Sequence, residues 1–378
     1  MQQTEPALLS PVTTAVRQRL AVGWLVALIA ANTVASTGLL GDIANHVSRG
    51  SGLTGSDFLS GWHLVLYGGV AAAALVIGAL GVVEGPAAPY RLLPAAVAGL
   101  VVLCMGGATD AWWHRAWGVE ASFDALVSPP HLLILTGLVL LTIAPIGAVA
   151  AEPGALLDWG RSAVVGASVL SLLTVVSLFT AYLSPLAAGT DLGGTDLSDV
   201  TSGEVTDLSA TDLAATTGMV FEEPLLGTST GDQETARGLA SALWFSALVT
   251  LVVLVAQARG RTRPGTWTIT FGILGLGPVI VNDTNTVPLT IGLLAFGVGA
   301  DIVTLRARPH PLAFGAAVAL MWAAYFATLS SRGDLIWDRE LWAGVIATGL
   351  LAGAAAAGVV RWLTEARQAA SPGARPLA

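Results

Sequence analysis

Long apolar stretches alternate with short polar connections along this chain, and the pattern predicts an all-α membrane protein. A helix needs about 20 largely apolar residues to cross the hydrocarbon core of a bilayer. Ten stretches of that kind occur, at 20–41, 62–83, 92–113, 131–151, 162–186, 238–258, 265–281, 286–305, 311–331 and 341–363. We therefore expect a polytopic helical bundle of about ten transmembrane helices.

The composition agrees with this pattern. Hydrophobic residues make up 54% of the chain and charged residues only 11%, with a mean hydropathy of +0.73. The residues before position 19 are polar, and the first apolar run is long enough to span, so we expect a membrane helix rather than a cleaved signal. The lipid bilayer is the expected partner, and no nucleic acid is expected.

Arginine positions predict the orientation in the cell membrane, since the chain contains no lysine. If the N-terminus is cytoplasmic, twelve arginines fall in inner segments and five in outer segments. Loops on the cytoplasmic side carry the excess of basic residues. We expect a multi-pass protein with both termini in the cytoplasm.

The same pattern divides the chain into six parts. They are a cytoplasmic N-terminal segment at 1–19, a duplicated four-helix unit at 20–151, a fifth helix at 152–186, an acidic outer loop at 187–237, a five-helix scaffold at 238–363 and a cytoplasmic tail at 364–378. The acidic loop is either a cover over an outer site or a solvated surface. Its polar, acidic composition favours the solvated surface.

One frame of polar residues occurs twice, as Asp-x3-His-x3-Gly-x9-Ser-x2-His. The first copy consists of Asp42, His46, Gly50, Ser60 and His63. The second copy, 68 residues later at every position, consists of Asp110, His114, Gly118, Ser128 and His131. Four of the five histidines lie in these frames. We interpret the frames as a tandem repeat of helices 1–2 and 3–4, and the predicted orientation puts both frames at the outer face.

The residue types in the frames predict metal binding. An Asp and a His four residues apart lie on one face of a helix, and the second His returns on the next helix. Two imidazoles and a carboxylate suit a transition metal. Asp110 and His114 close an apolar span, where polar side chains are costly and usually functional. The expected ligands, in two mononuclear sites or one dinuclear site, are Asp42, His46, His63, Asp110, His114 and His131. The alternative is a network of hydrogen bonds between helices.

Neighbouring side chains have simpler interpretations. Ser60 and Ser128 precede the second histidines and are expected to cap the following helices. Three acids are expected in solvated loops, where they could also add a carboxylate ligand: Asp57, Glu120 and Asp124. Four tryptophans suit an aromatic belt at the membrane interface: Trp62, Trp112, Trp113 and Trp117. Cys104 and Met105 are expected to pack in the core, and His310 lies at the opposite face.

The two triads resemble those of one membrane subunit of the copper membrane monooxygenases, the particulate methane and ammonia monooxygenases. In that family an Asp-x3-His is followed by a His on the next helix, and later by an Asn-x3-His with another His. The triad of Asp42 resembles the first site, and the triad of Asp110 resembles the second, with Asp110 in place of Asn. The resemblance covers about residues 40–135 and implies copper and oxygen chemistry.

Two functions follow as expectations. The first is a subunit of a copper-dependent, monooxygenase-like oxidoreductase, which would need other membrane monooxygenase-type subunits as partners. The alternative is non-enzymatic capture, storage or relay of copper or zinc, with a metal chaperone as partner; iron also fits two histidines and a carboxylate. Haem binding is disfavoured by the Asp four residues before the His. Proton-coupled transport is disfavoured because almost no ionisable residue lies mid-span.

Overall fold

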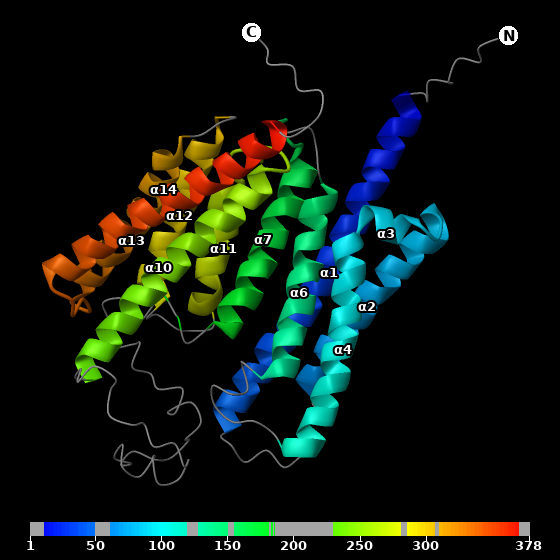
Figure 1. The fold of residues 1–378 in the computed structure, drawn as a ribbon, viewed down its shortest axis with the longest axis horizontal. Helices are drawn as coiled ribbons and strands as arrows, with labels where there is room; N and C mark the ends of the chain where they lie inside the picture. The colour runs from blue at the N-terminus through cyan, green and yellow to red at the C-terminus, as the bar shows by residue number, and fades with distance from the viewer. Residues whose placement is uncertain are drawn as a thin grey trace.

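The computed structural model describes residues 11–49, 61–118, 128–149, 155–180, 183, 185, 230–280, 286–306 and 310–369. These parts are helical and contain no β-strand (Figure 1). The helices are α1 (Pro11–Arg49), α2 (Gly61–Glu84), α3 (Ala88–Leu92), α4 (Pro94–Trp117), α6 (Pro129–Ala148), α7 (Trp159–Phe179), α10 (Thr230–Gln257), α11 (Thr266–Ile280), α12 (Val287–Thr304), α13 (Pro311–Arg332) and α14 (Arg339–Ala369).

The prediction of an all-α, multi-pass membrane bundle is confirmed. In the described residues, nine helices are long and apolar enough to cross a bilayer. The seventh predicted span is α11, whose 15 residues rise by only about 22 Å. The helix of the sixth predicted span begins earlier than expected. It is α10, which starts at Thr230, inside the stretch at 187–237 that was predicted to be a loop.

The helices pack mostly with their neighbours along the chain. α1 pairs with α2 and α4 pairs with α6, while α11, α12, α13 and α14 pack in succession. α7 contacts α1 and α6 on one side and α10 and α11 on the other, and so joins the two halves of the bundle (Figure 1). The candidate ligands of the second frame lie in the half formed by α1, α2, α4 and α6.

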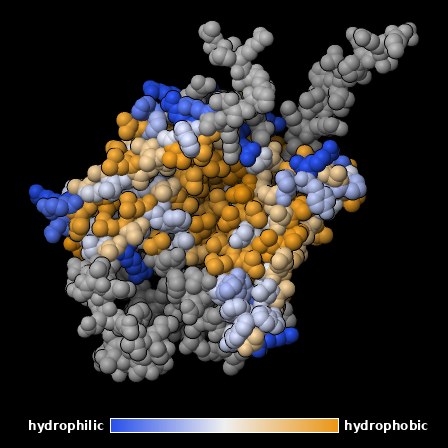
Figure 2. Space-filling view, viewed as in Figure 1, coloured by the Kyte–Doolittle hydropathy of each residue, from blue (hydrophilic) through white to orange (hydrophobic). Residues whose placement is uncertain are grey.

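Large apolar side chains lie on the outside of the bundle. Those more than half exposed include Leu75, Val82, Val101, Ile269 and Ile302. Figure 2 shows hydrophobic residues across the middle of the visible face and hydrophilic residues toward its upper and lower margins. Such a belt would be unfavourable in water and is the surface that a lipid bilayer covers.

Asp301 has a structural role at the end of the bundle away from His114. Its carboxylate accepts hydrogen bonds from the backbone N–H groups of Trp267 (3.1 Å) and Thr268 (2.9 Å), and from the Thr268 hydroxyl (2.6 Å). These amides belong to the first turn of α11, where no intrahelical partner exists. A side chain of α12 therefore caps α11, which explains an acidic group in an apolar span.

Asn32 of α1 compensates for a proline within α6. Pro145 has no N–H, so it cannot donate to the carbonyl of Leu141 one turn earlier. Asn32 is 3% exposed, and its Nδ2 donates to the Leu141 carbonyl over 3.0 Å. In the apolar interior an unsatisfied carbonyl is costly. This contact therefore couples α1 to α6 at mid-height.

We expect Asn32→Leu to lower the free energy of unfolding by about 1–3 kcal/mol, the cost of a buried group left without its partner. In a Pro145→Ala background the helix regains an N–H for Leu141, so Asn32→Leu should cost clearly less. Unfolding in detergent micelles as a double-mutant cycle measures the difference. The substitution also removes the Asn32 Oδ1, which has no hydrogen-bond partner among the described residues. It does so in both backgrounds, so this contribution to the free energy of unfolding cancels in the cycle. Equal losses would contradict the assignment.

Candidate metal centre

Asp110 and His114 continue the seam along which α4 meets α6. Gly99, Gly106 and Asp110 are buried on that face at helical spacing, and His114 follows one turn later. α4 ends at Trp117 and is followed by Gly118, whose φ of +87° suits glycine. The two ligand-type residues thus occupy the last turns of the helix, facing the next helix rather than lipid.

His131 reaches the same point from α6. Pro129 and Pro130 occupy the first positions of that helix, where a missing N–H carries no penalty. Ser128 precedes them, and His131 lies in the first turn. Because the hairpin is antiparallel, the first turn of α6 lies beside the last turns of α4, and His131 faces Asp110.

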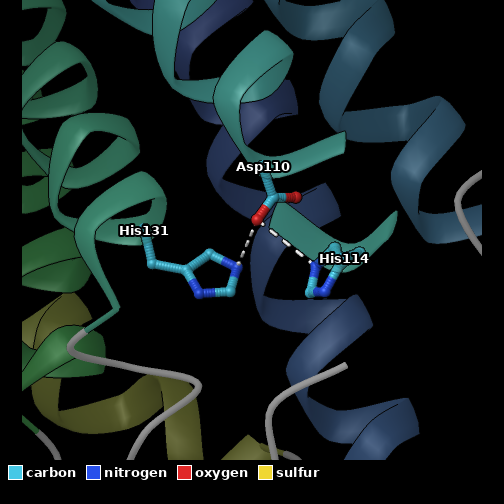
Figure 3. A group of neighbouring side chains, drawn as sticks. All are labelled: Asp110, His114 and His131. Carbon is cyan, nitrogen blue, oxygen red and sulfur yellow. Dashed lines mark ion pairs between the residues drawn. The ribbon is translucent and has the colours of Figure 1, made fainter. Parts of the chain in front are cut away.

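Three atoms converge there (Figure 3). The Asp110 Oδ1 lies 3.3 Å from the His114 Nε2 and 3.4 Å from the His131 Nε2. One ligand atom from each residue lies within 4.8 Å of the other two, a spacing that could hold one metal ion. Both separations exceed the usual length of an N–H···O hydrogen bond, about 2.7–3.2 Å.

The other nitrogen of each ring is held by a neighbour. The His114 Nδ1 lies 3.3 Å from the Gly118 carbonyl oxygen, and the His131 Nδ1 lies 2.8 Å from the Ser128 Oγ. A carbonyl only accepts, so a hydrogen bond at the Gly118 contact requires the proton on the His114 Nδ1. Metal-binding histidines usually donate their second N–H to such a partner, which turns Nε2 toward the ion.

In that neutral tautomer, acceptor atoms face one another at this point. With its proton on Nδ1, neutral His114 presents the Nε2 lone pair to a carboxylate oxygen, which also only accepts. The Asp110 Oδ1 is buried and has no partner in hydrogen-bond geometry among the described residues. Burying such an oxygen alone is costly. A cation between the three atoms would remove this conflict, so the residues fit a metal ion.

A close contact between α4 and α6, one helical turn from Asp110, fixes the distance between the two helices at the centre. A Cβ on Gly106 would lie 3.0 Å from the backbone nitrogen of Ile134. Gly99 and Gly137 form a second close contact deeper in the seam. Small residues allow helix backbones to approach within a membrane. Glycine at these positions therefore brings Asp110 within reach of His131.

The first frame is only partly within the described residues. The backbone of Asp42 and His46 belongs to α1, but their side chains lie outside the described residues, as does Ser60. His63 lies near the start of α2, stacked on Tyr67 with ring centroids 5.8 Å apart. The predicted acids Asp57, Glu120 and Asp124 also lie outside the described residues.

The other candidates lie around or away from the centre. Trp117 packs against Trp112 and Trp113 in a cluster at the end of α4, as a belt would require. Met105 is 56% exposed and Cys104 is also exposed, so the prediction that they pack in a core is wrong. The helical periodicity of α4 places both on a face other than the seam.

His310 lies at the start of α13 and is separate from the centre. Its Nδ1 accepts a hydrogen bond from the Leu312 N–H over 3.2 Å, as an N-cap. Arg261 and Arg263, which follow α10, lie at the same end of the bundle. Their side chains donate to the carbonyls of Leu305 and Leu157.

Sequence reasoning missed the role of Ser128. Ser128 occupies the N-cap position, but its hydroxyl makes no capping hydrogen bond and lies against His131 instead. Pro130 accounts for part of the difference, since it removes the N–H at the second helical position, one of the two that an N-cap side chain accepts from. The Ser-Pro-Pro-His sequence held this signal. The Gly118 carbonyl had no comparable signal.

Comparison of the chain with protein-family models, with curated proteins and with solved structures gave no match. The resemblance to the copper membrane monooxygenases therefore rests on the six residues of the two triads.

Gly106→Ala should weaken metal binding without changing a ligand. The added methyl meets the α6 backbone and separates Asp110 from His131, and we expect a loss on the order of tenfold, the lower end for residues that orient metal ligands. Gly107→Ala is the matched control, because no atom lies within 4 Å of its Cβ position. Competition titration with a chelating dye measures both. Equal affinities would contradict the role of the seam.

Ser128→Ala should lower the affinity of the centre for metal by roughly 10–100-fold, because His131 loses the group that orients its ring. Ser128→Thr keeps a hydroxyl and should stay near the wild-type value. Isothermal titration of the purified protein measures both variants. A loss in Ser128→Thr as large as in Ser128→Ala would point to packing rather than to the hydrogen bond.

Proposed function

We propose that this multi-pass membrane protein binds a transition-metal ion at Asp110, His114 and His131. The observation that carries the proposal is the convergence of two imidazole nitrogens on one buried carboxylate oxygen, with one ligand atom of each residue within 4.8 Å of the other two. A network of hydrogen bonds between the helices would need a proton between each imidazole nitrogen and the Asp110 oxygen. The arrangement suits a cation better than such a network.

The role of the ion is proposed from the resemblance. Copper follows from the similarity to the copper membrane monooxygenases, and the donor set equally suits zinc or iron. A redox role would make the chain one component of a larger oxidoreductase. Capture or relay of metal is the second candidate, and it is favoured by the exposure of His114 and His131, whose side chains are 23% and 24% exposed.

A second site at Asp42, His46 and His63 is also proposed. Its support is the packing of the first hairpin, α1 with α2. Gly38 lies against the backbone of Leu66, and Gly69 against that of Ala35. The positions 68 residues later make the same contacts, since Gly106 lies against Ile134 and Gly137 against Leu103. Because the backbones of the two hairpins make the same contacts, we expect the ligand-type residues of the first hairpin to be placed like those of the second.

We further propose that the centre faces the outside of the cell. Arg91, Arg161, Arg261 and Arg263 all lie at the end of the bundle away from His114. If that end is cytoplasmic, as the arginine bias favours, the ligands lie at the outer membrane surface. Metal could then reach them without crossing the bilayer.

Metal content of detergent-purified protein, measured by mass spectrometry, tests the proposal. We expect one ion per chain for a single centre and two if the first triad also binds. His114→Ala and His131→Ala should each lose one ion, because two remaining ligands hold a metal far less tightly. His46→Ala should lose one ion only if the second site exists.

His310→Asn is the control, because it removes an imidazole at the other end of the bundle and keeps an N-cap acceptor. It should retain the wild-type metal content. Protein that stays metal-free after reconstitution with copper, zinc and iron would overturn the proposed function. Copper would favour the oxidoreductase role and zinc the handling role.

A further inference from the structure

A cluster of arginines lies at the end of the bundle away from His114. Its members are Arg161 in α7, Arg259, Arg261 and Arg263 in the connection from α10 to α11, and Arg306 after α12. We propose that this arginine cluster binds an anionic phospholipid of the membrane leaflet at that end. The site is separate from the metal centre and does not depend on the proposed function.

The connection from α10 to α11 is fixed against the start of α7. The Arg261 backbone N–H donates to the Ala155 carbonyl over 2.8 Å. Further along, the Arg263 backbone N–H donates to the Ser162 hydroxyl over 3.0 Å. Because Ser162 directly follows Arg161, this contact brings the first helical turn of α7 beside the connection.

On its other side the connection reaches the end of α12. The Arg261 Nη1 donates to the Leu305 carbonyl over 2.8 Å, and Arg306 is the next residue. Arg259 lies two residues before Arg261 and is exposed, as is Arg306. Hydrogen bonds therefore link the arginine cluster from α7 to α12 and hold its members in one place.

Positive charge exceeds negative charge in these segments. In the described residues of 155–165, 255–270 and 298–306 the acids are Asp158 and Asp301, against the five arginines. Asp158 caps α7, and Asp301 is buried and accepts from the first amides of α11. A phosphodiester is a good partner for the excess of charge, because guanidinium groups donate strong hydrogen bonds to phosphate oxygens.

Apolar side chains beside the arginine cluster favour a phospholipid over a free phosphate ion. Ile269 in α11, and Ile302 and Leu305 at the end of α12, are all more than half exposed. Trp159 is also more than half exposed, and the Arg263 guanidinium carbon lies 5.9 Å from the centroid of its ring. Exposed tryptophans concentrate at the level of the lipid headgroups. A headgroup phosphate would thus lie at the level of Arg263, with the acyl chains along α11 and α12.

Lipid binding by the full-length protein in detergent micelles tests the proposal. We would titrate phosphatidylglycerol or phosphatidylcholine into the purified protein and count the bound lipids by native mass spectrometry. We expect the wild-type protein to bind phosphatidylglycerol more tightly. In Arg259→Gln/Arg306→Gln the affinity for phosphatidylglycerol should fall about 25-fold, because each arginine near anionic lipid contributes a factor of roughly five. Both side chains are exposed, so we expect the variant to fold.

Arg115→Gln/Arg339→Gln is the matched control, because it removes two exposed arginines at the other end of the bundle. The micelle presents the lipid to both ends, so a general effect of net charge would weaken binding equally in the two double variants. Arg259→Lys/Arg306→Lys keeps the positive charges and should retain most of the affinity.

Three outcomes would overturn the proposal. They are equal affinities of the wild-type protein for the two lipids, equal losses in the two glutamine variants, and displacement of phosphatidylglycerol by an equal concentration of inorganic phosphate. The last result would show that the arginine cluster takes a free anion instead of a lipid. Metal content tests the proposed function separately, so either conclusion can fail while the other stands.

Discussion

The contact between α4 and α6 at Gly106 is the constraint on which the candidate centre depends. Backbone meets backbone there, with no room for a side chain between Gly106 and Ile134. Asp110 lies one turn further along the same seam and His131 one turn before Ile134. The width of the seam therefore sets the separation of the ligands. In a bilayer, where helices gain little from burying apolar surface, such close packing is a main source of cohesion.

Polar groups within this bundle divide into two kinds. Asp301 and Asn32 satisfy backbone groups that would otherwise be unpaired, and their hydrogen bonds account for their presence. Asp110 differs, because its Oδ1 has no partner in hydrogen-bond geometry within the described residues. Its two neighbours are held by Gly118 and Ser128 through their other nitrogens. The surroundings thus hold the two rings beside the carboxylate, in a group that could bind a metal ion.

The seam is also connected to the remainder of the bundle. α6 is interrupted by Pro145, and α1 supplies the hydrogen bond that the proline removes. α7 then packs against both α1 and α6 and links them to α10 and α11. A shift of α6 along or away from α4 would therefore disturb contacts in three other helices. The position of α6 beside α4 is therefore tied to the packing of α1 and α7 as well.

The sequence alone determined the fold class and the residue types of the centre, because apolar runs define spans and an Asp-x3-His pair shares a helix face whatever surrounds it. It also placed His131 at the start of the next helix. Only the tertiary structure decided that both Nε2 atoms meet one Asp110 oxygen, that Ser128 serves His131 rather than the helix end, and that Cys104 and Met105 face outward. These depend on helix rotation and on approach distance. Both are fixed by packing between helices, which spacing along one chain does not encode.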